Sequence, residues 1–120
     1  MLPQAFALAA IVAMPALAQK APDYAKFADE ARTAVARIAI DPASAQFRDL
    51  FVSVTPNPAE EGRMRWALCG EMNAKNRYGG YVGFQRFIAY RMPGAPFEVV
   101  TGDLVETFWG ATCASVTRKL

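Results

Sequence analysis

The sequence contains no histidine and only two cysteines among its 120 residues. Without histidine, the chain lacks the commonest metal ligand and the commonest general base of enzymes. The interior of the chain has no uninterrupted apolar run of about 18 residues, which excludes a protein that crosses a membrane several times. Neither sign of charge is in large excess, because the chain has 13 basic and 11 acidic residues. Together with 14 aromatic residues, this balance excludes a disordered chain, and the length fits at most one domain.

The first 18 residues carry no charge, and 15 of them are hydrophobic. Such a short apolar stretch, ending in Ala16-Leu17-Ala18, is typical of a secretory signal peptide, and we expect cleavage after Ala18. An N-terminal anchor helix is the alternative, but Pro15 breaks the stretch and its length would span a bilayer poorly. No cysteine follows the cleavage site, so a lipid anchor is not indicated. We therefore expect residues 19–120 to form a single periplasmic or secreted domain with no membrane span.

The two cysteines are Cys69 and Cys113, which export would place in an oxidising compartment. We expect them to form a structural disulfide. Closing a loop of 44 residues stabilises a protein by roughly 4 kcal/mol in the chain-entropy model. A redox-active pair needs Cys-x-x-Cys, which this spacing excludes, and two cysteines without histidine make a poor metal site.

Apolar residues at spacings of three and four predict an N-terminal helix that begins near Pro22 and Asp23 and ends before Asp41-Pro42. Its apolar face is mostly alanine and its polar face is mixed in sign, which favours packing on a sheet over lying on a membrane surface. The Asp41-Pro42 pair also predicts a short helical turn, with Asp41 as its cap and Pro42 at its first position.

The middle of the chain alternates between strand-like and turn-like segments, which predicts an antiparallel meander of about four strands. In the first strand we expect Leu50, Val52 and Val54 on one side. We expect Phe47 and Phe51 on the other. The expected strands cover residues 47–55, 64–72, 82–91 and 97–101.

Near the C-terminus, Asp103 followed by Glu106 resembles a capping box and predicts a short helix that leads to Cys113. Gly110 and several β-branched residues weaken this helix, and a fifth strand over residues 112–116 is the alternative. The expected fold class is α+β, with an N-terminal helix packed on the meander and a short C-terminal helix tied by one disulfide.

The most distinctive segment lies between the second and third expected strands. Asn76 and Gly79-Gly80 tolerate the positive φ angles of a hairpin turn, so an ordinary turn with solvated charges is one interpretation. Tyr78 and Tyr81 beside basic and amide side chains also form a composition enriched in recognition sites. The candidate binding residues are Asn73, Lys75, Asn76, Arg77, Tyr78 and Tyr81.

Three motifs stand out along the chain. They are Asp41-Pro42-Ala43-Ser44-Ala45-Gln46-Phe47-Arg48, the run from Cys69-Gly70-Glu71 through Asn73-Ala74-Lys75-Asn76 to Gly79-Gly80-Tyr81, and Phe108-Trp109 before Cys113. Together they resemble an uncharacterised family of small exported proteobacterial proteins. The resemblance spans most of residues 19–120 and implies export, a small mixed fold and the pairing of Cys69 with Cys113. It assigns no activity and no role to any residue.

Catalytic chemistry finds little support in the sequence. A serine or cysteine nucleophile lacks a histidine base, and no Ser-x-x-Lys motif offers lysine instead. The glycines after Asn76 lack the lysine and the helix of a phosphate-binding loop. A carboxylate pair from Glu71 with Asp103 or Glu106 leaves a hydrolase as an alternative. We expect a protein that is not an enzyme and that needs no cofactor or metal.

A net charge of +2 is too mild for nucleic-acid binding. A basic patch on an envelope protein would more naturally meet anionic lipid, lipopolysaccharide or an acidic protein surface. Six basic residues could share one face of the sheet: Arg63, Arg65, Lys75, Arg77, Arg86 and Arg91. The sequence predicts a non-catalytic binding module of the cell envelope that recognises a protein or envelope component through residues 73–84. The alternatives are a cryptic envelope hydrolase that uses Glu71 and a structural subunit of an envelope assembly.

Overall fold

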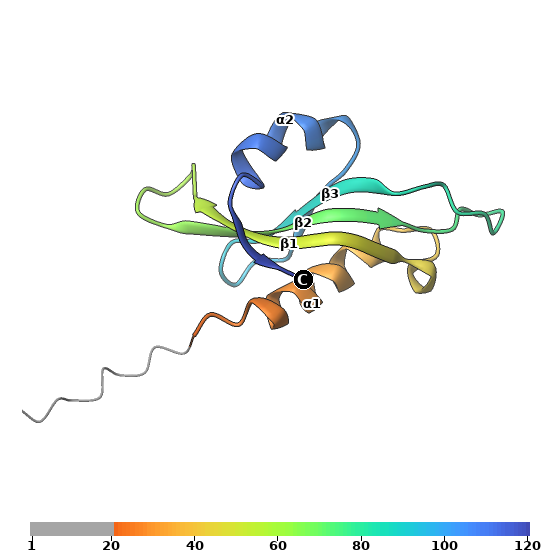
Figure 1. Ribbon diagram of the computed structural model, residues 1–120, viewed down its shortest axis with the longest axis horizontal. Helices are drawn as coiled ribbons and strands as arrows, with labels where there is room; N and C mark the ends of the chain where they lie inside the picture. The colour runs from red at the N-terminus through yellow and green to blue at the C-terminus, as the bar shows by residue number, and fades with distance from the viewer. Residues whose placement is uncertain (1–20) are drawn as a thin grey trace, which may run out of the picture.

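The computed structural model describes residues 21–120, in which two helices cover the two faces of a five-stranded antiparallel sheet (Figure 1). This architecture confirms the expected α+β class. The expected signal peptide, residues 1–18, lies outside the described residues. Among residues 21–120, no helix is long and apolar enough to cross a membrane.

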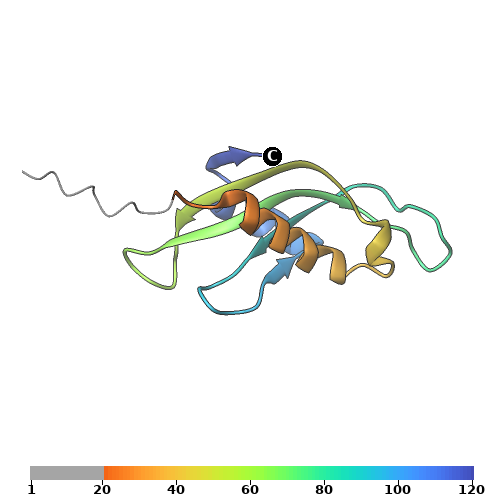
Figure 2. The same ribbon diagram turned by 90° about the horizontal axis from the view of Figure 1, so that it is seen from below.

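The first helix, α1, spans Tyr24–Arg37 and begins where the sequence predicts. The side chain of Asp23 accepts a hydrogen bond from the backbone N–H of Lys26 at 2.9 Å, which satisfies one of the free donors of the first turn. Phe27, Ala28, Ala31 and Val35 form the buried face of the helix. The small alanines let α1 lie close against the sheet, as Figure 2 shows from below.

A short 3-10 helix, η1, spans Pro42–Ser44 directly after α1, and Pro42 occupies its first turn as expected. Asp41 precedes it, but the side chain of Asp41 makes no capping hydrogen bond. Instead the Ser44 hydroxyl donates to the backbone carbonyl of Asp41 at 2.7 Å. The turn therefore places Ser44 at the start of the sheet, where it meets a later part of the chain.

The sheet has the strand order β4-β3-β2-β1-β5, with every neighbouring pair antiparallel. The first four strands form the expected meander, and the last strand returns to pair beside β1. The sheet therefore has one strand more than the four expected. The strands are β1 (Gln46–Pro56), β2 (Met64–Asn73), β3 (Gln85–Tyr90), β4 (Glu98–Val100) and β5 (Val116–Lys119).

The C-terminal region forms the predicted helix, and a fifth strand also forms, but it begins at Val116 and does not cover the residues 112–116 of the alternative prediction. The second helix, α2, spans Asp103–Thr112 and precedes β5. The predicted capping box is wrong, because Gly102 is the cap residue and no side chain bonds to the free N–H groups there. Gly102 has a φ of +68°, which glycine adopts without strain, so Asp103 falls inside the first turn.

A bulge in β1 changes which side chains share a face. Asp49 has a φ of +54°, and the pairing register with β2 shifts between Arg48 and Phe51. Phe47 therefore packs in the core beneath α1 together with Leu50, so its predicted position on the opposite face is wrong. Phe51 does lie on the other face, where its ring meets that of Trp109.

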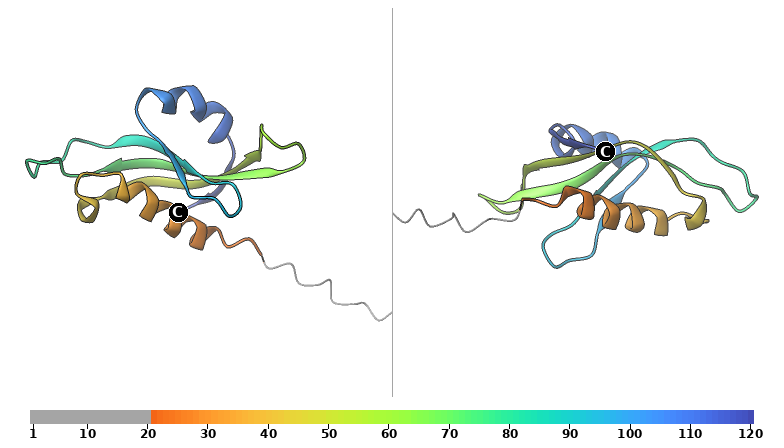
Figure 3. Two further views of the ribbon diagram at one scale, coloured as in Figure 1. Left: turned by 180° about the vertical axis from the view of Figure 1, so that it is seen from behind. Right: turned by 60° about the horizontal axis from the view of Figure 1, so that its bottom comes forward.

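Cys69 and Cys113 form a disulfide with a Cα–Cα distance of 6.1 Å, as predicted. Both residues belong to the smaller core beneath α2, together with Ala67, Ile88 and Val105. The bond therefore joins the end of α2 to the middle of β2. The two sides of the sheet, with α1 below and α2 above, are clearest from behind in Figure 3.

Candidate functional site

The connection between β2 and β3, residues 73–84, projects beyond the rest of the sheet at one end of the molecule (Figures 1 and 3). We call these residues the hairpin. The β2–β3 ladder ends at Met72 and Gln85, and beyond it one isolated bridge joins Lys75 to Tyr81. The hairpin therefore depends on its own turn and on neighbouring residues for its shape.

Asn76 organises the turn of the hairpin. Its side-chain Oδ1 accepts hydrogen bonds from the N–H groups of Tyr78 at 2.9 Å and of Gly80 at 3.1 Å. Its backbone N–H donates to the carbonyl of Gly80, and its backbone carbonyl accepts from Gly79. Gly79 has the expected positive φ, +80°, but Asn76 does not. Asn76 thus shapes the turn through its side-chain acceptor and not through the positive φ that the sequence suggested.

The base of the hairpin is fixed on η1. The backbone N–H of Lys75 donates to the Ser44 hydroxyl at 2.8 Å, and the Tyr81 hydroxyl donates to the Ser44 carbonyl at 3.2 Å. Asn73 is buried, and its side chain accepts a hydrogen bond from the N–H of Gly83 at 2.9 Å. Asn73 and Asn76 therefore hold the hairpin together, and their side-chain acceptors are already occupied.

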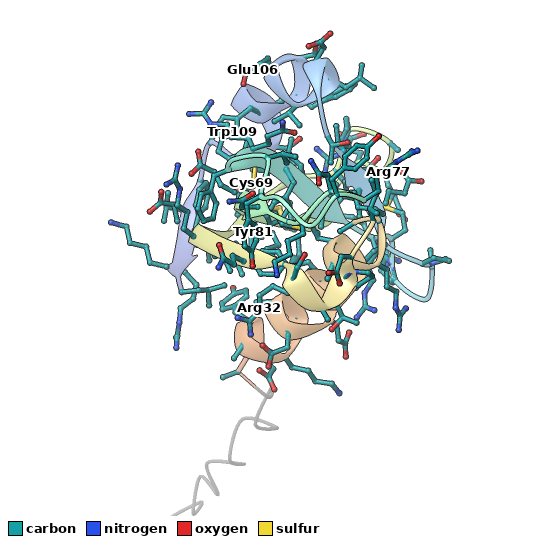
Figure 4. All side chains as sticks on the ribbon, turned by 90° about the vertical axis from the view of Figure 1, so that its right-hand side faces the viewer. Arg32, Cys69, Arg77, Tyr81, Glu106 and Trp109 are labelled. Atoms are coloured by element: carbon teal, nitrogen blue, oxygen red, sulfur yellow. A yellow bond between two sulfur atoms is a disulfide. The ribbon has the colours of Figure 1, made fainter. Side chains whose placement is uncertain are left out.

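The side chains of the other four candidate residues are fully or partly accessible to solvent. Tyr78 is 87% exposed and Tyr81 is 45% exposed. The Lys75 ammonium lies 5.6 Å from the centre of the Tyr81 ring, and Arg77 is exposed. Figure 4, which looks at the hairpin end of the molecule, shows Arg77 and Tyr81 on this surface. The hairpin thus offers two aromatic rings and two cations.

A hollow of about 230 Å³ lies beside the hairpin and was not predicted. It separates the hairpin from the segment that follows α1. Its apolar lining consists mainly of Ile38, Ile40, Met72, Val82 and Phe87. The helical periodicity predicts Ile38 on the apolar face of α1, but the helix ends at Arg37 and Ile38 is 52% exposed, so that prediction is wrong. Ile40 lies beyond the helix, where its periodicity predicts nothing.

A larger hollow, about 680 Å³, lies elsewhere, between α1, the connection from β3 to β4, and β4. An ion pair between Glu30 and Arg91 at 2.7 Å joins its two walls, and the Arg91 guanidinium also lies over the Phe97 ring. Arg37 also lines this hollow and forms no ion pair within residues 21–120. Glu30 is the one acidic side chain of the lining, and it is already paired.

Two of the three carboxylates of the hydrolase alternative, those of Glu71 and Glu106, are bound to arginines. Glu71 accepts a hydrogen bond from the Nε of Arg48 at 2.6 Å, and Arg48 also covers the Phe84 ring. Glu106 pairs separately with Arg86 at 3.6 Å. Within residues 21–120, no group of three or more acidic or cysteine side chains is placed to hold a metal ion.

The six basic residues that could have shared one face of the sheet do not do so. Arg65 donates to the hydroxyl of Thr112 at the end of α2. Arg91 pairs with Glu30 on α1, which covers the opposite face. The basic groups of the hairpin therefore form a separate, smaller set.

Comparison with known proteins found no matching family model, no matching curated protein and no matching solved structure. The function must be inferred from the geometry of the chain itself.

Proposed function

We propose that this protein is an exported, non-catalytic binding module of the cell envelope, which recognises a protein or an envelope component through the hairpin. The observation that carries the proposal is Tyr78, which is 87% exposed on a turn whose backbone is held by Asn76. A large aromatic ring in water contributes nothing to folding, but it gives contact area to a partner. A turn that is already ordered loses little conformational freedom when it binds.

The disulfide between Cys69 and Cys113 supports the export part of the proposal, because such bonds persist in oxidising compartments. The pairing of Glu71 with Arg48 argues against the hydrolase alternative, because the Glu71 carboxylate is already bound by the Arg48 guanidinium.

The proposal is tested by capture from periplasmic and envelope extract with the oxidised protein, beside a Tyr78→Ala/Tyr81→Ala variant that keeps its circular dichroism spectrum. A Met64→Ala/Leu104→Ala variant is the matched control, because it removes two similarly exposed apolar side chains away from the hairpin. We expect the wild type and the control to capture the same partner. The captured partner, once purified, should bind the tyrosine variant at least about tenfold more weakly, the scale of a modest aromatic hot spot. Equal affinity for both variants, or no partner for the wild type, would refute the proposal.

A further inference from the structure

Exposed apolar side chains gather at the hairpin end of the molecule. Ten large hydrophobic residues are exposed among residues 21–120, and five of them lie on the hairpin or on the segment after α1. These five are Ile38, Ile40, Tyr78, Tyr81 and Val82. Three of them, Ile38, Ile40 and Val82, line the same hollow, and the Tyr81 hydroxyl bonds to η1. Single exposed apolar residues are ordinary, whereas a cluster of this kind marks a surface that meets another phase or molecule.

The charges at this end are basic and largely uncompensated. The hairpin carries Lys75 and Arg77 and no acidic residue, and neither cation forms an ion pair within the described part of the chain. Arg37 at the end of α1 is a third cation, and Asp41 is the single acid of the adjoining segment. The nearby acids Glu71 and Glu106 are neutralised by other arginines, as described above. Arg48 is shared between Glu71 and Asp49, whose carboxylate lies 4.0 Å from it at the bulge of β1. Three cations against the two acids Asp41 and Asp49 still leave this end positive.

The hairpin and the segment from α1 to η1 reach the same end of the molecule in the views of Figures 1, 2 and 3. Tyrosine and aliphatic tips beside flexible cations are the groups that settle at the boundary between lipid headgroups and acyl chains. The side-chain oxygens of Asn73 and Asn76 already accept hydrogen bonds inside the hairpin. The surface therefore offers a partner mainly apolar contact and positive charge.

From these observations we infer that the hairpin end docks reversibly on the surface of an anionic phospholipid bilayer. Tyr78, Val82 and Ile40 enter the headgroup region, and Lys75 and Arg77 lie against lipid phosphates. This inference rests on the proposed function and identifies the envelope component as lipid. The apolar patch is small and the cations are few, so the binding is weak and depends on salt.

The test is flotation of the oxidised protein, recovered after export with its N-terminus determined by mass spectrometry. The probes are vesicles of phosphatidylcholine alone and vesicles with about one third phosphatidylglycerol, at low and high salt. We expect binding to the anionic vesicles at low salt. It should weaken at least about tenfold on neutral vesicles or at high salt, as expected for two to three cations near a charged surface.

Two pairs of variants locate the contact. Lys75→Gln/Arg77→Gln and Tyr78→Ser/Val82→Ser should each weaken binding to anionic vesicles about tenfold or more. Their controls are Arg118→Gln/Lys119→Gln, on the exposed strand β5, and Met64→Ser/Leu104→Ser. The controls should bind like the wild type.

No binding to anionic vesicles, equal binding to neutral vesicles, or equal losses in the control variants would overturn the inference. If vesicle binding is absent while a protein partner is still captured through Tyr78, the lipid surface is wrong and the binding hairpin stands. Loss of both vesicle binding and partner capture overturns the inference and the proposed function together.

Discussion

Gly70 in β2 has no room for a side chain beside β1. A Cβ added there would lie 2.5 Å from Cδ2 and 3.2 Å from Cα of Leu50, and 3.3 Å from the carbonyl oxygen of Arg48. The bulge at Asp49 fixes this backbone, so the clash has little room to relax. Gly70→Ala should lower the free energy of unfolding by about 1–3 kcal/mol in urea denaturation.

Gly110 provides the matched control for this substitution. No atom lies within 4 Å of a Cβ built on Gly110, which lies inside α2. Gly110→Ala should therefore raise the free energy of unfolding by about 0.5–1 kcal/mol, because alanine favours helix. Equal effects of the two substitutions would contradict the close packing at Gly70.

Tyr90 makes the free energy of unfolding depend on pH in the alkaline range. Its hydroxyl donates a hydrogen bond to the carboxylate of Glu98, and this bond, followed by burial, raises the pKa of Tyr90 above its ordinary value although Arg65 lies over the ring. The neutral phenol is therefore more favoured in the folded chain than in the unfolded chain. Its contribution is fully present below about pH 10 and is lost as pH rises through the folded-state pKa.

The measurement is urea denaturation of the wild type and Tyr90→Phe between about pH 8 and pH 11. The wild type should be the more stable protein at pH 8, and its advantage should shrink above about pH 10. A difference that stays constant over the whole range would show that the Tyr90–Glu98 bond does not control this titration.

At the residue scale, the sequence predicts well where the interaction is local. Asp23 caps α1 because an acidic residue before a helical pattern bonds to an N–H three positions later. The same logic fails for Asp103, because the chain must first leave β4 through the positive φ of Gly102. For Asn76, the residue type correctly predicted a turn, but several turn geometries use asparagine, and only the structure shows which one is formed.

At the element scale, the stability of the hairpin depends on one side chain. Asn76→Ala removes the acceptor for two backbone N–H groups, those of Tyr78 and Gly80. Amide hydrogen exchange measured by NMR should become faster at these two positions, while the global free energy of unfolding falls by about 1 kcal/mol or less for such exposed bonds. Tyr78→Ala is the control, because the Tyr78 ring is not part of these bonds and should leave exchange unchanged. Unaltered exchange in Asn76→Ala would mean that the turn is held by its backbone bonds alone.

A helix or strand can be predicted from the sequence when the pattern that specifies it lies within a single segment. The periodicity of α1 and the alternation of the meander strands lie within single segments, and the structure confirms both. The bulge at Asp49 is not written in the hydrophobic pattern, which is why Phe47 was assigned to the wrong face. The hollow beside the hairpin forms from segments that are more than 30 residues apart, and no local pattern records such a meeting.

At the scale of the whole molecule, the chain builds two cores on one sheet. α1 closes the larger core, and α2 closes the smaller one on the opposite face. β5 then pairs with β1 although more than 60 residues separate Phe51 from its partner Lys119. Such long-range pairing costs loop-closure entropy, and the sequence could not rank it against other possible edge partners.

The disulfide offsets part of that entropy cost, because it links the middle of β2 to the end of α2 across 44 residues. For a loop of this length the chain-entropy model gives about 4 kcal/mol, a large share of the stability expected for about 100 residues. Cys69→Ala/Cys113→Ala should therefore lower the free energy of unfolding by about 4 kcal/mol in urea denaturation. A reducing agent should destabilise the wild type similarly and leave the double variant unchanged. A loss below about 1 kcal/mol would show that the two cores sustain the fold unaided, and the disulfide would then no longer tie folding to an oxidising compartment.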